Sequence, residues 1–253
     1  MNGCNQESEK DMKNNEEVNQ ERWVGIGFFT IIALIVILAI AQNAPSAEDK
    51  PATKVTDDFK QLDSDKWHVR SPNEALVGVK DGELILINRG YVFSKRQVVK
   101  KVTITLDWAW KDRTKNDQKF LYADHLLVLL RSTGEVNKAR SYESLDGLRV
   151  RIIAGTGAVR LEKANGEKEG DILKEELLPK EAGQPALASD TFHNIVVSDD
   201  GTEVIVSVNG KEALKHKYKG EFKGKLLGIA NRESVGFPHE SRIKNIALEF
   251  VDK

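Results

Sequence analysis

Two tryptophans stand out as side chains whose type and spacing could serve ligand binding. Trp108 and Trp110 are two residues apart, so both indoles point to the same side of an extended strand. Either they plug the core, which is the default for large aromatic side chains, or one of them projects into a groove. In a groove, an indole would stack on the apolar face of a sugar ring.

Four arginines are the matching polar candidates. Arg149 and Arg151 alternate with apolar residues in Leu148–Ile153, so they share one side of a predicted strand. Such a pair either keeps a sheet face soluble or lines a polar groove, where the guanidinium N–H groups donate hydrogen bonds to oxygen atoms of a ligand. Arg131 and Arg232 lie at predicted strand ends, where each could either form an ion pair or contact a ligand.

Metal ligation is not predicted from the histidines and aspartates. Metal-ligand spacing is absent among His125, His193 and His239. The pairs Asp57-Asp58 and Asp199-Asp200, together with Asp124, could supply oxygen ligands to calcium, but no loop of regularly spaced oxygens surrounds them. Turn formation is the favoured interpretation. We expect no metal and no cofactor.

The elements that position these residues are short β-strands. Apolar and polar residues alternate with a period of two in nine segments: Leu84–Asn88, Lys101–Trp110, His125–Arg131, Leu148–Ile153, Ala158–Lys163, His193–Ser198, Glu203–Asn209, Leu226–Asn231 and Ile243–Val251. Turn dipeptides separate them: Asp81-Gly82, Asp146-Gly147, Asn165-Gly166, Asp200-Gly201 and Asn209-Gly210. Many short strands joined by such turns predict an all-β, antiparallel sandwich or barrel.

Three details of this pattern can be checked. The valines of Glu203–Asn209 should share the more buried face, with Ile205 and Ser207 on the other. Ile172–Glu181 is interrupted by Pro179, so it predicts a short turn at most. Lys211–Lys225 alternates charge with aromatic residues. The best explanation is an edge strand whose charged side chains prevent pairing with the strand of another chain. The alternative is binding of an anionic polysaccharide.

Thr191–Lys211 carries a resemblance to a known superfamily. Its sequence TFHNIVVSDDGTEVIVSVNGK reads as a strand, an Asp-Asp-Gly turn, a second strand and an Asn-Gly turn. It resembles the concanavalin A-like lectin/glucanase superfamily, including laminin G-like modules and the 3-keto-disaccharide hydrolase domain. Further segments agree with it: Asp57–Trp67, Asp81–Leu84, Leu226–Glu233 and Ser241–Phe250. The resemblance covers about residues 55 to 251 and implies a jelly-roll β-sandwich, with His193 as a structural histidine.

The resemblance does not by itself imply an enzyme, because this fold hosts lectins, enzymes and adhesion modules. Retaining glucanases of the superfamily carry Glu-x-Asp-x-x-Glu on one strand, and this sequence lacks that pattern. Tyr142-Glu143 is similar to a Tyr-Glu pair of the 3-keto-disaccharide hydrolase domain, which makes Glu143 the one weak catalytic candidate. The plainer interpretation is a solvated loop.

An apolar run precedes this domain. Trp23–Ala41 has no charged residue, and about 19 residues at about 1.5 Å each cross a hydrocarbon layer of about 30 Å. It therefore predicts a transmembrane helix that acts as an uncleaved signal anchor. The alternative is a signal peptide cleaved after Ala41, because Ala39-Ile40-Ala41 fits the small-x-small rule. The long acidic leader opposes cleavage.

The expected organisation has four parts. Residues 1–22 form a polar cytoplasmic tail, residues 23–41 the transmembrane helix, residues 42–54 a flexible stalk, and residues 55–253 the β-sandwich domain. The expected location is the cell membrane, single-pass, with the β-domain extracytoplasmic. The single cysteine, Cys4, lies in the tail, so the domain has no disulfide.

These observations favour a non-catalytic module that binds a carbohydrate or an extracytoplasmic protein. A formal net charge of -1 argues against nucleic acid as a partner. The alternatives are a glycoside-processing enzyme and a structural envelope protein. The candidate ligand-binding residues are Trp108, Trp110, Arg131, Tyr142, Glu143, Arg149, Arg151 and Arg232.

Overall fold

Strands and tight turns alternate through the part of the chain that the structure describes. The computed structural model describes residues 52–70, 77–87, 90–98, 100–111, 125–136, 145–165, 168–232 and 240–252. They belong to one compact unit, Lys50–Lys253. Within these ranges the structure has no helix that is long and apolar enough to cross a membrane. The apolar run Trp23–Ala41, the tail before it and nearly all of the expected stalk lie outside them.

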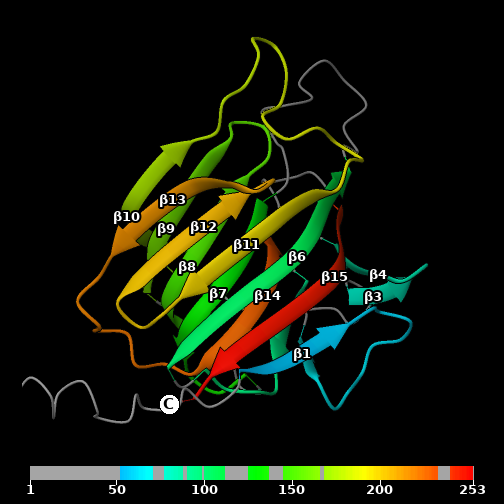
Figure 1. Cartoon of the computed structure of the whole chain (residues 1–253). Coiled ribbons are helices and arrows are strands. Elements are labelled where there is room, and N and C mark those ends of the chain that lie inside the picture. The colour runs from blue at the N-terminus through cyan, green and yellow to red at the C-terminus, as the bar shows by residue number, and fades with distance from the viewer. Residues whose placement is uncertain are drawn as a thin grey trace, which may run out of the picture. The chain divides into compact units, whose positions relative to one another are not determined.

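The first sheet has eight strands (Figure 1). They are β1 (Thr53–Asp57), β3 (Val77–Lys80), β4 (Glu83–Ile87), β6 (Lys101–Lys111), β11 (His193–Asp199), β12 (Glu203–Val208), β13 (Lys211–Lys217) and β15 (Glu240–Val251). Their order is β13-β12-β11-β6-β15-β4-β3. The long β15 pairs with β6 on one side, and with β4 and then β1 on the other.

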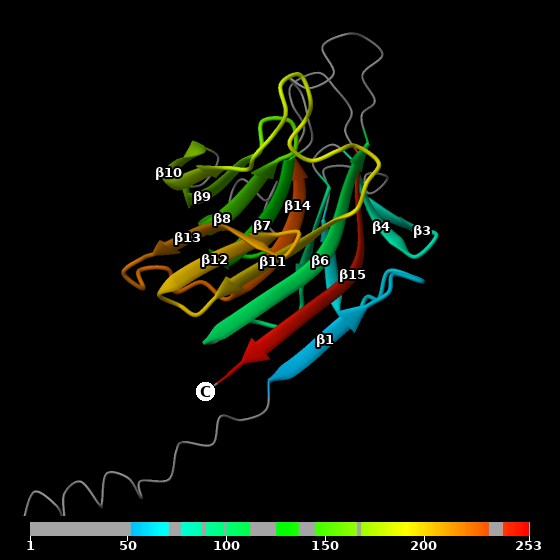
Figure 2. The same cartoon turned by 45° about the horizontal axis from the view of Figure 1, so that its top comes forward.

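The second sheet has seven strands. They are β2 (Trp67–Arg70), β5 (Tyr91–Ser94), β7 (His125–Thr133), β8 (Asp146–Ile153), β9 (Ala158–Asn165), β10 (Lys168–Leu177) and β14 (Leu226–Arg232). Their order is β10-β9-β8-β7-β14-β5-β2. Every pairing in both sheets is antiparallel, and the sheets stack as two layers (Figure 2). The predicted antiparallel β-sandwich is confirmed.

The core lies between the sheets, where each strand contributes every second side chain. Val204, Val206 and Val208 of β12 are buried there, whereas Ile205 and Ser207 are partly exposed, as their alternation predicted. Such a strict period is typical of a sheet with one face in the core and one in water.

Two predicted turns have the expected backbone. Asp81-Gly82 and Asn209-Gly210 have positive φ at both residues, which suits the type I′ hairpin turn. The turn predicted at Asp146-Gly147 is wrong, because both residues belong to β8. A Cβ on Gly147 would lie 2.8 Å from the carbonyl oxygen of Arg131, so glycine serves a close backbone approach there.

The edge strands β10 and β13 differ in how well the sequence pattern predicts them. Ile172–Glu181, predicted as a turn, largely belongs to β10, the outermost strand of the seven-stranded sheet. Register shifts on either side of Asp171 and Ile172 break its period of two, which hid the strand. The edge strand predicted within Lys211–Lys225 is present as β13. β1 begins at Thr53, inside the range expected for the stalk.

Candidate functional site

The two tryptophans of β6 belong to the core. Trp108 and Trp110 are fully buried, and each indole N–H has an internal acceptor at 3.0 Å, Ser241 Oγ for Trp108 and the carbonyl of Leu187 for Trp110. Core packing was the first of the two alternatives for this pair. The hypothesis that one indole projects into a ligand groove is therefore wrong, because both rings pack in the main core between the two sheets.

Arg131 also has an internal role. It has a positive φ at a bulge of β7, where the register of β7 and β8 shifts. Its Nε donates to Asp199 Oδ2 of β11 at 2.7 Å, and its Nη2 donates to the carbonyl of Lys100. Tyr218 donates its hydroxyl to Asp199 Oδ1 at 2.6 Å. Arg131 thus joins the two sheets by a buried ion pair, which explains it without a ligand.

Burial and the hydrogen bond to Asp199 both disfavour ionisation of the phenol beside this ion pair. They raise the pKa of the Tyr218 hydroxyl well above its usual value. The proton on Tyr218 therefore stays in place to donate to the carboxylate.

The motif that carried the resemblance forms a structural clip. Asn209 Nδ2 donates to Nδ1 of His193 at 3.2 Å, and Asn209 Oδ1 accepts the backbone N–H of Asn194. Nε2 of His193 lies 3.1 Å from the carbonyl of Ala188, which accepts its proton. Asp200 Oδ1 accepts the backbone N–H groups of Thr202 and Glu203, which makes it a turn residue.

Arg149 and Arg151 are brought together with an acidic residue that sequence analysis did not single out. Arg151 Nη2 donates to Glu162 Oε2 at 2.8 Å, and Arg149 Nε forms an ion pair with the same oxygen at 3.2 Å. All three side chains project from the outer face of the seven-stranded sheet, yet all are buried. We call Arg149, Arg151 and Glu162 the charge cluster. Burial excludes the idea that these arginines simply solubilise a sheet face.

Apolar side chains continue the same outer face away from the charge cluster. This apolar strip consists of Tyr91, Phe93, Leu127, Leu129 and Ala230. The strand register places Leu129 beside Arg149, and then Gly228 and Phe93 in one row across the sheet. Gly228 leaves room for the ring, because a Cβ there would lie 2.7 Å from Phe93.

The remaining candidates lie around this face or outside the described residues. Arg232 is opposite His125 at the end of β14, on the same outer face. Tyr142 and Glu143 fall outside the described residues, as do Asp124 and His239. Val136 and Leu145, on either side of residues 137–144, pack against the apolar strip.

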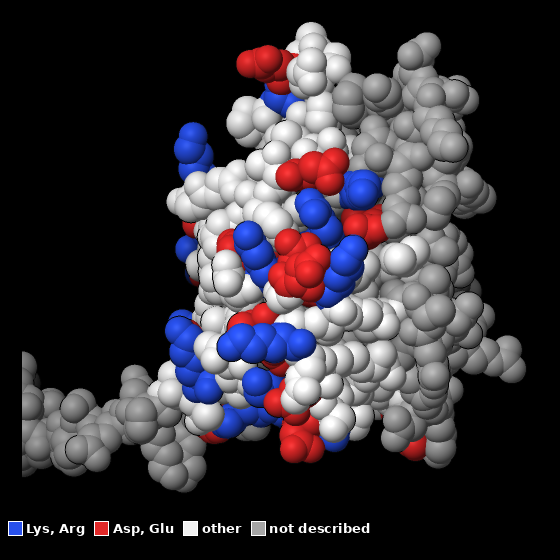
Figure 3. Space-filling model, turned by 90° about the vertical axis from the view of Figure 1, so that its right-hand side faces the viewer, with Lys and Arg blue, Asp and Glu red and all other residues white. Residues whose placement is uncertain are grey.

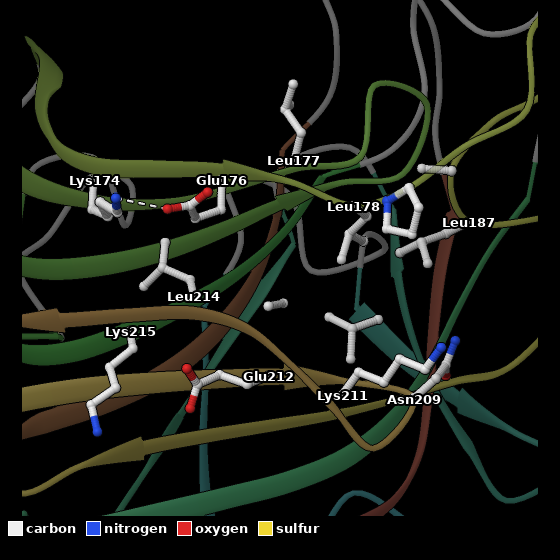
Figure 4. A pocket seen from close by; sticks show the side chains of 14 residues that line it. Lys174, Glu176, Leu177, Leu178, Leu187, Asn209, Lys211, Glu212, Leu214 and Lys215 are labelled. Carbon is white, nitrogen blue, oxygen red and sulfur yellow. Dashed lines mark ion pairs between the residues drawn. The ribbon is translucent and has the colours of Figure 1, made fainter.

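A groove opens between the two edge strands β10 and β13 (Figure 4). It encloses about 660 Å³, and Leu178, Leu187 and Leu214 contribute to its apolar surface. Its rim carries both charges, including the Lys174–Glu176 pair at 2.7 Å. None of the described residues that line it is aromatic, so they provide no aromatic ring on which a sugar could stack.

Neither the charged surface in Figure 3 nor the possible metal ligands of the described residues indicate a site. In that view, Lys and Arg are interspersed with Asp and Glu. Exposed ion pairs of the described residues include Lys54–Glu249 and Lys60–Asp58. Such a mixture creates no field of one sign. Within the described ranges, no three His, Cys, Asp or Glu side chains are grouped so that they could hold a metal ion.

Solved structures share this architecture at low sequence identity. The carbohydrate recognition domain of Emp47p is 12% identical, with a TM-score of 0.55, over 82% of this chain and 100% of that chain. The β-glucanase of Bacillus licheniformis is 10% identical, with a TM-score of 0.53, over 80% and 99%. The carbohydrate-binding module CBM66 of Bacillus subtilis is 10% identical, with a TM-score of 0.50, over 72% and 93%.

Sequence comparison alone finds less. No family model matches this sequence, and no curated protein matches it. At such identities the similar structures establish the fold and leave the function open. The sandwich of this chain has the concanavalin A-like lectin/glucanase fold, as its sequence motif indicated.

Proposed function

We propose that this chain is a membrane-anchored, extracytoplasmic module that binds glycans through the outer face of its seven-stranded sheet. The observation that supports this most is the charge cluster beside the apolar strip. The hydroxyl groups of a sugar ring form hydrogen bonds with polar side chains, and its C–H groups pack against apolar or aromatic side chains. The cluster and the strip place both kinds of partner on one face, and because these side chains are almost fully buried, binding requires part of that face to open.

The dimensions of the face suit an oligosaccharide. Charge cluster residues lie on β8 and β9, and the aromatic residues Tyr91 and Phe93 lie on β5, three strands from β8. Neighbouring strands are about 4.8 Å apart, so the two groups are separated by about 14 Å. If the face opens, a chain of linked sugars is long enough to contact both groups, whereas a single ring is not.

Binding without turnover fits the carboxylates of this face better than catalysis. Glycoside hydrolysis needs two carboxyl groups about 5 to 10 Å apart, one on each side of the bond. Glu162 is held by two guanidinium groups, and Glu175 of β10 is paired with Arg160. Both are therefore engaged in ion pairs. A glycoside-processing role would depend on Glu143 instead.

Carbohydrate binding also occurs in proteins of this fold. CBM66 and the recognition domain of Emp47p are named for it, and each covers at least two thirds of this chain. The β-glucanase of Bacillus licheniformis is the corresponding enzyme case. The apolar run Trp23–Ala41 supports the membrane anchor.

The binding test uses the full chain in a detergent with a polyoxyethylene head group, because sugar-headed detergents would compete. We expect weak, saturable binding to a subset of glycans on an array that includes neutral, carboxylated and sulfated chains. Binding to none of them would refute the glycan-binding proposal and favour a structural envelope protein. Cleavage of a bound glycan that Glu143→Gln abolishes would establish the enzyme alternative.

The location is tested separately by protease protection on intact cells or spheroplasts, with the mass of the mature chain. We expect an accessible β-domain on an uncleaved chain. A mature chain that begins at Gln42 would remove the anchor, and a protected β-domain would reverse the orientation.

A further inference from the structure

Three chain connections meet at the end of the sandwich where β1 begins. The backbone N–H of Val98 donates to the carbonyl of Lys225 at 2.9 Å, which joins the β5–β6 connection to the β13–β14 connection. The backbone N–H of Tyr218 donates to the carbonyl of Thr202 at 2.7 Å, which joins the β13–β14 connection to the β11–β12 turn. These hydrogen bonds bring residues 95–100, 200–202 and 218–225 together.

Exposed lysines gather in these connections and at the strand ends beside them. Four of them come from Lys211–Lys225, the lysine-rich segment of the sequence, and the fold adds three from the β5–β6 connection and the start of β6. We call these seven exposed side chains the basic end: Lys95, Lys100, Lys101, Lys217, Lys219, Lys223 and Lys225.

Fewer unpaired carboxylates accompany the basic end. Asp200 and Glu221 belong to the same connections, and Glu135 lines a hollow beside Lys95. Two further pairs are each neutral as a whole, Arg96–Asp252 and Lys215–Glu203. The formal net charge of the whole chain is -1, so the positive charge at this end is a local excess.

The N-terminal segment enters the β-sandwich beside the basic end. Thr53 of β1 pairs with Phe250 of β15, and Phe250 pairs with Val102 of β6, next to Lys101. Neighbouring strands are about 4.8 Å apart, so the first residue of β1 lies about 10 Å from the start of β6. In Figure 1, the beginnings of β1 and β6 and the end of β15 lie at the same end of the sandwich.

The distance along the chain from the apolar run to β1 is short. Eleven residues, 42–52, separate Trp23–Ala41 from β1, and they span at most about 40 Å when fully extended. A domain tethered so closely to a membrane meets its surface at a high effective concentration. Weak attraction by several lysines is then sufficient to orient the domain.

We propose that the basic end contacts the membrane in which the chain is anchored and binds the phosphate groups of anionic lipids. The proposal rests on the membrane anchor of the proposed function and goes beyond glycan binding. Each ammonium group attracts anionic head groups as a point charge, and salt screens this attraction over about 10 Å at 0.1 M. The contact turns the opposite end of the sandwich away from the membrane.

The test uses the full chain in liposomes of phosphatidylcholine, alone or in a roughly 3:1 mixture with phosphatidylglycerol. A membrane-impermeant amine reagent is applied briefly, and mass spectrometry measures the labelling of each lysine relative to Lys180. Lys180 is exposed and follows β10 at the opposite end of the sandwich, so the ratio within one molecule cancels differences in orientation of insertion. We expect the relative labelling of the basic end to fall about threefold or more in anionic liposomes and to recover in about 0.5 M NaCl.

Matched double variants assign the protection to the basic end. Lys219→Gln with Lys223→Gln should abolish most of the protection of Lys100 and Lys101, because it removes two of the attracting charges. The control, Lys180→Gln with Lys211→Gln, removes two exposed charges at the opposite end and should keep the protection. Lys80, in the β3–β4 hairpin, is the reference lysine for both variants.

Each other outcome overturns the proposal in a recognisable way. Equal relative labelling in the two kinds of liposome does so, as does protection that persists in Lys219→Gln with Lys223→Gln. Protection by dextran sulfate in neutral liposomes, without protection by phosphatidylglycerol, identifies an anionic polysaccharide as the partner instead. A chain that does not float with neutral liposomes refutes the anchor and the proposal together. The glycan array bears only on glycan binding, so the two failures are distinguishable.

Discussion

The outer faces of the two sheets differ, although the inner faces share one core. On the eight-stranded sheet, β11 and β12 alternate strictly between buried and partly exposed residues. On the seven-stranded sheet, β5 is buried throughout, and β7, β8 and β14 are buried at nearly every residue, so their outer faces form a second interior. A solvated outer face is sufficient for a stable sandwich. The two sheets therefore differ in whether their outer faces meet solvent.

The two sheets also differ in the burial of their charged side chains. On the eight-stranded sheet, Lys54 and Glu249 form an ion pair that is exposed to solvent. The seven-stranded sheet buries the charge cluster, in which Nε and Nη2 of Arg149 make no hydrogen bond to a described residue. Buried ion pairs of this kind are rarely a net source of stability. A ligand gives a physical reason for keeping them.

The largest expected effect concerns the ion pair that joins the two sheets. Arg131→Met should lower the free energy of unfolding by about 3 to 5 kcal/mol, because it leaves Asp199 buried without its charge partner. Arg242→Met removes a partly exposed guanidinium and should cost less than about 1 kcal/mol. Urea denaturation measures both. Equal losses would mean that Arg131 does not join the sheets energetically.

The next effect tests the two outer faces directly. Leu129→Ala, on the seven-stranded sheet, should cost about 2 to 5 kcal/mol, because the residue is buried in the apolar strip. Ile205→Ala, on the outer face of the eight-stranded sheet, should cost about 1 kcal/mol, since its side chain is partly solvated. The comparison between the faces fails if both variants lose the same stability.

A third prediction uses two strand glycines. Gly228→Ala should cost about 1 to 3 kcal/mol, because the new Cβ would lie 2.7 Å from Phe93. Gly78→Ala, on β3 of the other sheet, meets no atom within 4 Å and should be neutral or slightly stabilising. Thermal unfolding of the two variants checks this. A tolerated alanine at position 228 would show that the outer face is loosely packed.

A smaller effect depends on pH. The pKa of Tyr218 is raised in the folded state by burial and by Asp199, above the unfolded value of about 10. Its contribution to stability is therefore complete below about pH 10 and declines as the pH rises through the folded-state pKa. Tyr218→Phe should cost about 1 to 2 kcal/mol at neutral pH, and the difference from wild type should shrink in alkali. A difference that stays constant up to pH 12 would contradict this assignment.

Much of the fold could be predicted because the eight-stranded sheet follows a simple rule. Valines at every second position of β12 and the turns at Asp81-Gly82 and Asn209-Gly210 each have one physical meaning, and each was read correctly. The strand β10 was missed because its bulges break the period. Asp146-Gly147 was misread because glycine can serve a close approach as well as a turn.

The candidate site was harder to predict, because its residues come from separate strands. Arg149 and Arg151 could be placed on one face from their spacing, but their partner Glu162 depends on the pairing register of β8 with β9. The alternation of Arg160 with Glu162 in Ala158–Lys163 was the available signal. The environment of Trp108 could not be predicted from the sequence. Its spacing from Trp110 places both indoles on one side of the strand, but it does not say whether that side faces the core.

The central claim is that the charge cluster serves a ligand and that the fold does not need it. Denaturant unfolding of Arg149→Met without ligand tests it most directly. The variant keeps the Arg151–Glu162 pair and removes the Arg149 guanidinium. Its free energy of unfolding should match wild type within about 0.5 kcal/mol or exceed it. A loss of about 3 to 5 kcal/mol would show that Arg149 is a structural ion-pair partner and would contradict the account.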